Sequence, residues 1–257
     1  GMVTDIGGFA AATFKRGSNL VNVPTTLLAM VDASVGGKTG INFGGLKNEI
    51  GAFAFPKTVI IDTQWLETLD HKNLLSGYAE MLKHGLITER KLLPTLLNFD
   101  TATFNLHQLS DMLKVSVAIK EQIVEQDPHE QGIRKALNFG HTFGHAFEEW
   151  AMTRHPILHG YAVAYGMVCE LYLSAIKQGF PQTIMRQTVN FIRNNYGTLP
   201  ITCDDYDTLI SLMIHDKKNA GNDINFSLLH DLGSVVINRT ATEEEIKDAL
   251  DFLREGV

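Results

Sequence analysis

The sequence predicts a chain in two parts, a mixed α/β part over residues 1–70 followed by a mostly helical part over residues 71–257. The clearest strand signals, at residues 19–23 and 58–62, both fall before residue 70. Beyond that point, apolar residues recur mainly at helical spacings of three and four. A length of 257 residues allows one large domain or two small ones.

In the first part, residues 5–16 read as a short helix, and the apolar run at 19–23, closed by Pro24, reads as a strand. Thr25 and Thr26 are suited to cap a helix through residues 27–31. The remaining elements are glycine loops at 36–40 and 44–48 and a strand at 58–62.

In the second part, the predicted helices cover residues 72–87, 105–126, 136–152, 160–178, 182–196, 205–215 and 242–254. Two short runs, 225–230 and 234–238, are expected to pair as a hairpin across residues 231–233.

Composition excludes several classes of protein. With 44% hydrophobic and 20% charged residues, wholesale disorder is excluded. The net charge of −7 argues against a nucleic-acid partner. Cys169 and Cys203 form no CxxC pair, which favours the reducing cytoplasm. No apolar run approaches the length of a membrane-spanning helix, so no membrane association is expected.

The chain opens with a glycine-rich stretch that includes Gly1, Gly7 and Gly8. Such a turn normally follows a strand and opens a helix, so that backbone N–H groups meet a phosphate. Because no strand precedes it, we expect either a fragment or a start at Met2 after an added Gly1. A flexible start without a role is the alternative.

A histidine pair is the first candidate for chemistry. On a helix, His141 and His145 share a face and can bind one metal ion. His159 and Glu80 are further candidate ligands. Two imidazoles and a carboxylate leave a coordination position open, which is the catalytic rather than the structural zinc pattern. Among ten histidines, such spacing also arises by chance.

Lysines in glycine loops are the second candidate. A lysine in a loop is usually solvated, but Lys38 and Lys47 lie in two such loops within ten residues, which raises the odds of an anion site. A Walker A loop is excluded because Asp32 stands where its first glycine should be.

Further polar groups interrupt apolar segments. They are Lys83, Lys120, Arg134, Asn138, Lys217 and Lys218. Lys83 follows Glu80 by three residues, so an exposed helical ion pair is one reading of the two. Lys217 and Lys218 can simply oppose a helix dipole.

Taken together, these segments resemble the 3-dehydroquinate synthases, of the sugar-phosphate cyclase superfamily. The matching stretches are residues 1–17, 23–29, 31–39, 47–53, 79–85, 137–145, 158–160 and 216–218. The resemblance implies the remnant of an NAD-binding α/β domain over residues 1–70. A helical zinc- and substrate-binding domain would follow over residues 71–257, and the family's preceding α/β half would be missing.

The resemblance also implies a reaction. A phosphate-eliminating lyase would convert 3-deoxy-D-arabino-heptulosonate 7-phosphate to 3-dehydroquinate and phosphate, with NAD and zinc, or cobalt, as cofactors. In the family, NAD transiently oxidises a ring hydroxyl, and the ketone acidifies the neighbouring C–H before phosphate leaves. Reduction, ring opening and aldol closure follow.

The resemblance also implies roles for individual residues, transferred from the family to the matching positions of this sequence. By resemblance, Glu80, His141 and His159 would hold zinc, and His145 would lie beside them or on the substrate phosphate. The carbocycle and phosphate pocket would be lined by Asp32, Lys83, Lys120, Arg134 and Asn138, with Lys217 or Lys218 adding a phosphate contact. The dinucleotide would contact Gly1, Asp5, Thr25, Thr26 and Thr68. Lys38, Lys47 and Asn48 would lie between cofactor and substrate, and Arg16 would reach the partner's site in a homodimer.

The sequence departs from the family at Tyr161, where the family often has Glu. Other readings remain open. One is another sugar-phosphate cyclase or a metal-dependent polyol dehydrogenase, and the other is a helical dimerisation module with a vestigial metal site.

Overall fold

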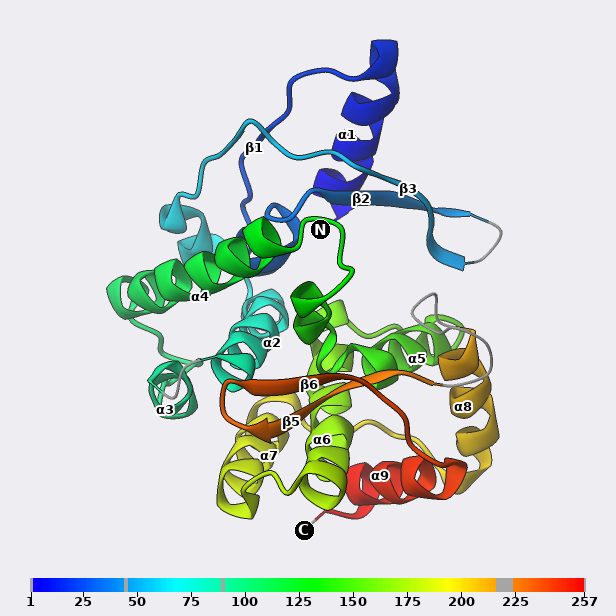
Figure 1. The fold of residues 1–257 in the computed structure, drawn as a ribbon. Coiled ribbons are helices and arrows are strands. Elements are labelled where there is room, and N and C mark those ends of the chain that lie inside the picture. Colours follow the sequence, from blue (N-terminus) through cyan, green and yellow to red (C-terminus); the bar gives the residue numbers. More distant parts are fainter. Residues whose placement is uncertain (1, 44–45, 89–90, 216–223, 257) are drawn as a thin grey trace.

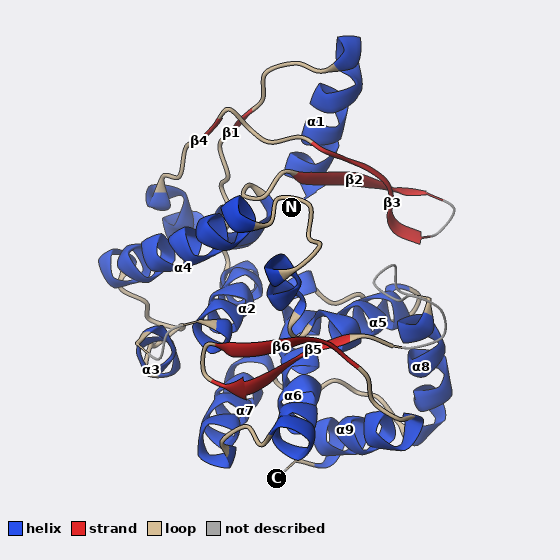
Figure 2. Ribbon diagram, in the orientation of Figure 1, coloured by secondary structure: helices blue, strands red, loops and turns tan. Residues whose placement is uncertain are grey.

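A computed structural model describes residues 2–43, 46–88, 91–215 and 224–256, without the side chains of residues 46–48. The amino-terminal elements form an open layer over a larger helical body (Figures 1 and 2). That layer comprises α1 (Met2–Thr13), η1 (Phe14–Arg16), β1 (Val21–Asn22), η2 (Ala29–Ala33), β2 (Lys38–Phe43), β3 (Leu46–Phe53), β4 (Thr58–Val59) and η3 (Thr63–Thr68). A mixed α/β portion followed by a mostly helical one agrees with the predicted fold class.

Two small sheets lie in this layer. β1 and β4 pair in parallel, with Val21 opposite Thr58, whereas β2 and β3 form an antiparallel hairpin. The prediction of glycine loops at 36–40 and 44–48 is therefore wrong for most of their length. Gly40 faces Gly51 across the hairpin and so lies within a paired strand, whereas Gly36 and Gly37 lie in the turn before β2. The strand expected at 58–62 is shorter, at two residues.

The helical body comprises α2 (His71–Ile87), α3 (Leu92–Leu97), α4 (Leu106–Gln126), η4 (Ile133–Asn138), α5 (His141–Met152), α6 (His159–Gln178), α7 (Gln182–Tyr196), η5 (Cys203–Asp205), α8 (Tyr206–Ile214), β5 (Phe226–Asp231), β6 (Ser234–Arg239) and α9 (Glu243–Glu255). The predicted β5–β6 hairpin is confirmed, and α3 was not predicted.

Helix α6 is the centre of this body. It contacts α2, α5, α7, α9 and β5, and is buried along most of its length. A helix that is apolar on all sides is typical of a core position. Its sequence therefore explains why the other helices arrange themselves around it.

The helix expected over residues 136–152 is broken. A 3-10 turn ends at Asn138, Gly140 takes a left-handed conformation with φ of 79°, and α5 begins at His141. The apolar periodicity runs through this break, so the pattern alone does not reveal it. The break places His141 in the first turn of α5.

Glycines bring α6 into direct backbone contact with two neighbouring elements. A Cβ on Gly160 would lie 1.8 Å from the carbonyl oxygen of Ser76 in α2. A Cβ on Gly166 would lie 2.0 Å from the carbonyl oxygen of Gly140. Any larger residue would force these elements apart, because interiors are close-packed.

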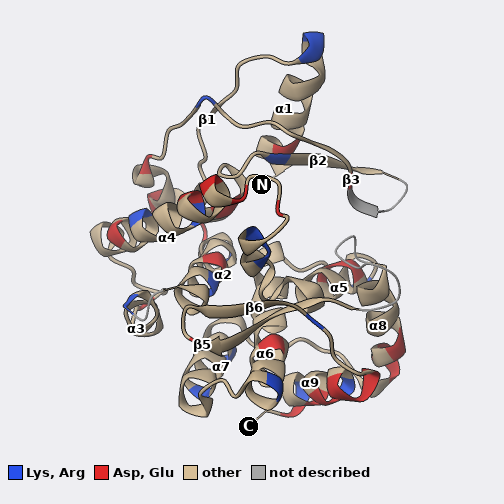
Figure 3. Cartoon of the chain, viewed as in Figure 1, with Lys and Arg blue, Asp and Glu red and all other residues tan. Residues whose placement is uncertain are grey.

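Helix α4 lies between the amino-terminal layer and the helical body (Figure 1). It contacts η2 and η3 of the layer, and α2 and η4 of the body. Lys and Arg alternate with acidic residues along α4 and α9, so neither helix carries a continuous basic stripe (Figure 3). Among the described residues, no helix has the length and apolar character needed to cross a bilayer.

Gly166→Ala tests the close approach of α5 and α6. We expect a loss of stability of about 1–3 kcal/mol or more, because the added methyl overlaps backbone atoms that cannot move independently. Gly7→Ala is the matched control, because a Cβ there meets nothing within 4 Å. Urea unfolding would measure both, and equal stability of the two variants would contradict the packing described.

Candidate metal and substrate site

Three side chains from three helices converge within the helical body. Glu80 comes from α2, His141 from the start of α5 and His159 from the start of α6. The Glu80 Oε1 atom lies 3.4 Å from His141 Nε2 and 3.5 Å from His159 Nε2. One ligand atom from each residue lies within 4.8 Å of the others, which suits a single bound cation.

The backbone contacts of α6 explain this convergence. Gly160, next to His159, touches Ser76, which lies one turn before Glu80 on α2. The N–H of Gly160 donates to the Ser76 hydroxyl at 3.1 Å. Gly166 touches Gly140, which immediately precedes His141. Each imidazole is thus one residue away from a backbone contact that fixes its position.

A buried acceptor at the cluster supports a metal. Glu80 is fully buried, and its Oε1 atom has no hydrogen-bond partner among the described residues. Its Oε2 atom accepts a hydrogen bond from Lys83 Nζ. Leaving a buried charged acceptor unpaired costs upwards of about 1–3 kcal/mol. A divalent cation between Oε1 and the two imidazoles would satisfy it, so these donors fit the zinc that the resemblance implies.

Both imidazoles are oriented through their other nitrogen. His141 Nδ1 lies 3.1 Å from the Phe139 carbonyl oxygen, and His159 Nδ1 lies 2.9 Å from Glu148 Oε2. Donation from Nδ1 leaves the Nε2 lone pair facing the cluster. Sequence reasoning missed Glu148, although it lies seven residues after His141 on the same face of α5.

The ion pairing around Glu80 is internal rather than exposed. Glu80 and Lys83 are 0% and 1% exposed, which excludes the surface ion pair kept as an alternative. Burial would raise the pKa of Glu80, but the charge of Lys83 and contact with His141 outweigh it and hold that pKa well below its usual range.

A second, partly buried pair joins α4 to the amino-terminal layer. Lys120 Nζ lies 2.5 Å from both Asp32 Oδ1 and the Asp32 carbonyl oxygen. Burial opposes ionisation of Asp32, yet the charge of Lys120 lowers its pKa below the usual range. The pair therefore places two charged groups at the boundary between the layer and the helical body.

The expected phosphate pocket has a feature that sequence reasoning missed. Glu130, at a φ of 59°, accepts hydrogen bonds from Lys38 Nζ and from Asn138 Nδ2, the latter at 2.7 Å. The Arg134 guanidinium donates to the carbonyl oxygens of Gly36, at 2.8 Å, and Pro128, at 2.5 Å. The sequence offered one signal for Glu130: it is an acidic residue four positions before Arg134 and eight before Asn138.

The other predicted residues are placed as follows. The His145 ring centroid lies 5.4 Å from that of His141 and 6.2 Å from that of His159.

Thr26 Oγ1 accepts a hydrogen bond from the Ala29 N–H at 3.2 Å, which confirms the predicted cap. Asp5 lies in the first turn of α1, and Thr25, Thr68 and Arg16 are exposed. Gly1, Lys217, Lys218 and the side chains of Lys47 and Asn48 lie outside the described residues.

Tyr161 packs its ring edge-on against Tyr196, with centroids 5.0 Å apart. Burial raises its pKa. The residue that departs from the family pattern is thus part of an aromatic contact between α6 and α7.

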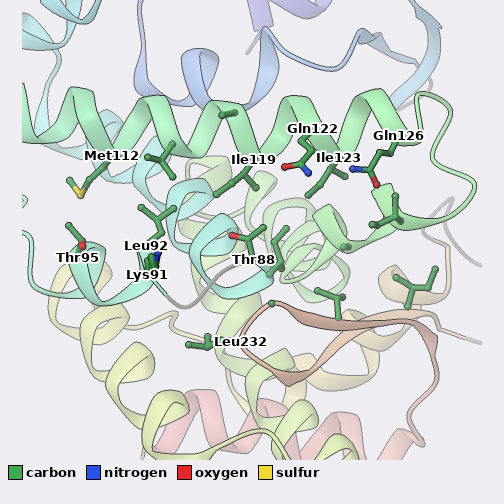
Figure 4. A pocket seen from close by; sticks show the side chains of 18 of the residues that line it. Thr88, Lys91, Leu92, Thr95, Met112, Ile119, Gln122, Ile123, Gln126 and Leu232 are labelled. Atoms are coloured by element: carbon green, nitrogen blue, oxygen red, sulfur yellow. The ribbon is translucent and has the colours of Figure 1, made fainter.

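A cavity of about 1410 Å³ is separate from these clusters. It lies between α4, residues 87–88 and 91–95, and the β5–β6 turn (Figure 4). Its walls are mostly apolar, with Met112, Ile119 and Ile123 from α4. None of the predicted site residues lines it, so the chemistry is not located by cavity size.

Solved structures place this fold in a class. The chain superposes on 2-epi-5-epi-valiolone synthase from Streptomyces hygroscopicus, solved with NAD+ and Zn2+, with a TM-score of 0.86 and 27% identity over 97% of this chain and 70% of that one. For 2-deoxy-scyllo-inosose synthase, complexed with carbaglucose-6-phosphate, NAD+ and Co2+, the TM-score is 0.84 at 25% identity, over 98% and 71%. The fold is that of the sugar-phosphate cyclases.

Sequence comparison then identifies the family. Residues 1–76 match the family 3-dehydroquinate synthase N-terminal, and residues 77–219 match 3-dehydroquinate synthase C-terminal. The chain is 57% identical to 3-dehydroquinate synthase of Parabacteroides distasonis, over all of this chain and 73% of the relative. It is 41% identical to that of Listeria innocua, over 100% and 70%. The chain belongs to the 3-dehydroquinate synthase family, which confirms the predicted resemblance.

Burial of His84 generates a prediction about stability. His84 Nδ1 lies 2.7 Å from Ser116 Oγ, and burial, together with the nearby Lys83 charge, lowers the pKa of His84 to about 3. The unfolded chain takes up this proton below about pH 6.5, whereas the folded chain does not until about pH 3. Stability should therefore fall with pH below about 6.5, by up to about 1.4 kcal/mol per unit from this residue.

His84→Asn should flatten that pH dependence, as measured by urea unfolding between about pH 7 and 5. His107→Asn, at an exposed position on α4, should leave the slope of the unsubstituted protein intact. If both variants kept the same slope, His84 would not be the titrating group.

Proposed function

We propose that the Glu80–His141–His159 cluster holds the catalytic zinc ion and that the surrounding cations bind the substrate of a 3-dehydroquinate synthase. The substrate would be 3-deoxy-D-arabino-heptulosonate 7-phosphate, and the products 3-dehydroquinate and phosphate. The observation that carries this proposal is the buried Glu80 Oε1 atom, which faces two imidazole nitrogens and has no hydrogen-bond partner among the described residues. Membership in a family of phosphate-eliminating lyases supplies the reaction.

The charge around the cluster supports an anionic substrate. Lys83, Lys120 and Arg134 are all buried, at 1%, 6% and 3% exposed. Buried cations are otherwise unfavourable, and they interact strongly with phosphate and carboxylate oxygens in a site of low dielectric constant. A phosphorylated sugar acid presents both kinds of oxygen.

The topology supports NAD as the second cofactor. Because β1 and β4 run in parallel, their carboxyl ends lie at one edge, and Thr25–Thr26 and η3, which ends at Thr68, follow at that edge. Dinucleotides bind beyond the carboxyl ends of parallel strands. When bound, NAD supplies reversible hydride transfer and zinc polarises substrate hydroxyl oxygens, which makes their protons easier to lose.

The residues of the chain then have separable tasks. Glu148 and the Phe139 carbonyl hold the two imidazoles in one orientation. Glu130 fixes Lys38 and Asn138, and Arg134 fixes the turn at Gly36, so the groups expected to meet phosphate are ordered in advance. Asp32 holds Lys120 in its buried position. His145, whose ring lies beside that of His141, would contact substrate oxygens.

The assembly, location and partners of the protein stay predictions. A homodimer in which Arg16 reaches the partner's site is consistent with the exposed position of Arg16 at the end of η1. A cytoplasmic location, with no nucleic-acid or membrane partner, fits a biosynthetic reaction on a small metabolite. The predicted division between residues 1–70 and 71–257 also remains a proposal.

The ligand assignment predicts zinc content. The unsubstituted chain should hold about one zinc per chain, and Glu80→Gln and His159→Ala should each lose it, because a three-ligand site does not tolerate removal of a ligand. Glu121→Gln, an exposed position on α4, is the control. Elemental analysis gives the answer directly. Unchanged zinc in Glu80→Gln would refute the assignment.

The substrate assignment predicts a different outcome for Lys120→Met. We expect activity to fall about 10²–10³-fold, because a preorganised cation is removed, while zinc content is retained. Lys114→Met is the matched control, since Lys114 is exposed on the same helix. The readouts are phosphate release and elemental zinc. Equal activity in the two variants would exclude Lys120 from the site.

A further inference from the structure

The amino-terminal end of α5 has no side-chain cap of its own. Gly140 occupies the capping position, where a Ser, Thr, Asp or Asn would normally accept hydrogen bonds from the first turn. The N–H groups of a helix's first turn need acceptors when they are buried. Gly140, His141 and Thr142 are all buried here.

A carboxylate from another helix takes this place. Glu170 of α6 accepts a hydrogen bond from the Gly140 N–H, 2.7 Å from its Oε2 atom. It accepts another from the Thr142 N–H, 3.1 Å from its Oε1 atom. Glu170 is fully buried, and the helix dipole of α5 favours a negative charge at this end.

The contact between the helices makes this reach possible. Gly166 lies one turn before Glu170 on the same face of α6, and it is the residue whose Cβ would collide with the Gly140 carbonyl. With the backbones in contact at that point, the next turn of α6 lies beside the first turn of α5. A short carboxylate side chain is then sufficient to reach two amides.

We propose that Glu170 is a positioning residue for the metal site. His141 lies between the two residues whose N–H groups Glu170 binds, so the carboxylate fixes the backbone that carries this imidazole. Helix α6 thereby contributes His159 directly and orients His141 through Glu170. This inference rests on the proposed zinc site.

A purely structural cap makes a different prediction from a positioning residue. A structural cap would change the melting temperature alone. A positioning residue would also change metal affinity and the coordination geometry that a bound ion reports, because the Nε2 atom of His141 would lose its fixed direction.

Glu170→Gln is the principal variant, because it preserves size but leaves one accepting oxygen and turns an NH2 group toward a backbone N–H. Glu170→Ala removes both acceptors. Ser174→Ala is the matched control on the next turn of α6. Its buried hydroxyl accepts from the Leu229 N–H at 2.9 Å and donates to the Glu170 backbone carbonyl at 2.6 Å, so its loss destabilises α6 but leaves the Glu170 carboxylate and its bonds to α5 in place.

The experiment measures zinc affinity by competition with a chelator, the visible spectrum of the Co2+-loaded protein, and the melting temperature. We expect Glu170→Gln to weaken zinc binding about 10–100-fold and to alter the Co2+ spectrum. Ser174→Ala should lower the melting temperature and leave both metal readouts unchanged. Glu170→Ala should weaken binding further if it folds.

The outcomes separate the two proposals. Zinc held by the unsubstituted chain and by Glu170→Gln with equal affinity and the same Co2+ spectrum would overturn the role of Glu170 alone. Zinc lost equally from Ser174→Ala would also overturn it, since general destabilisation would then explain the effect. Absence of stoichiometric zinc from the unsubstituted chain would overturn the proposed function, and this inference with it.

Discussion

The close approach of the α6 backbone to α2 and to the start of α5 is the constraint on which the candidate site depends. It is made by Gly160 against Ser76 and by Gly166 against Gly140. These contacts bring Glu80, His141 and His159 together although they lie far apart in sequence. A side chain at either glycine would separate the backbones. The metal site therefore depends on the same close packing that forms the core.

A consequence of this close packing is that several charged side chains are buried. Glu80, Lys83, Lys120 and Glu170 lie in the interior, where an isolated charge is strongly disfavoured. Each is compensated by a specific partner: Glu80 by Lys83, Lys120 by Asp32, and Glu170 by the first turn of α5. The Glu80 Oε1 atom is the exception, because it has no hydrogen-bond partner among the described residues, and the proposed cation would satisfy it.

How far the site was predictable from the sequence differs among its residues. Spacing along the chain favoured His141 with His145, which share a helix face, and the resemblance replaced that pair with Glu80, His141 and His159. The three residues do converge, but Glu130, Glu148 and Glu170 were not predicted. Each acts through a partner on a different turn or helix, and a lone Glu in an otherwise ordinary segment gives no periodic signal.

The sequence by itself determined the order and approximate limits of most helices, the β5–β6 hairpin and the family, because apolar periodicity and motif order are local properties. Only the tertiary structure decided that β2 and β3 pair as a hairpin and that α5 begins anew at His141. It also decided that Glu170 caps that helix. These features depend on which backbone segments are in contact. A glycine in the sequence does not indicate whether it will lie in a loop, in a strand or at a contact between helices.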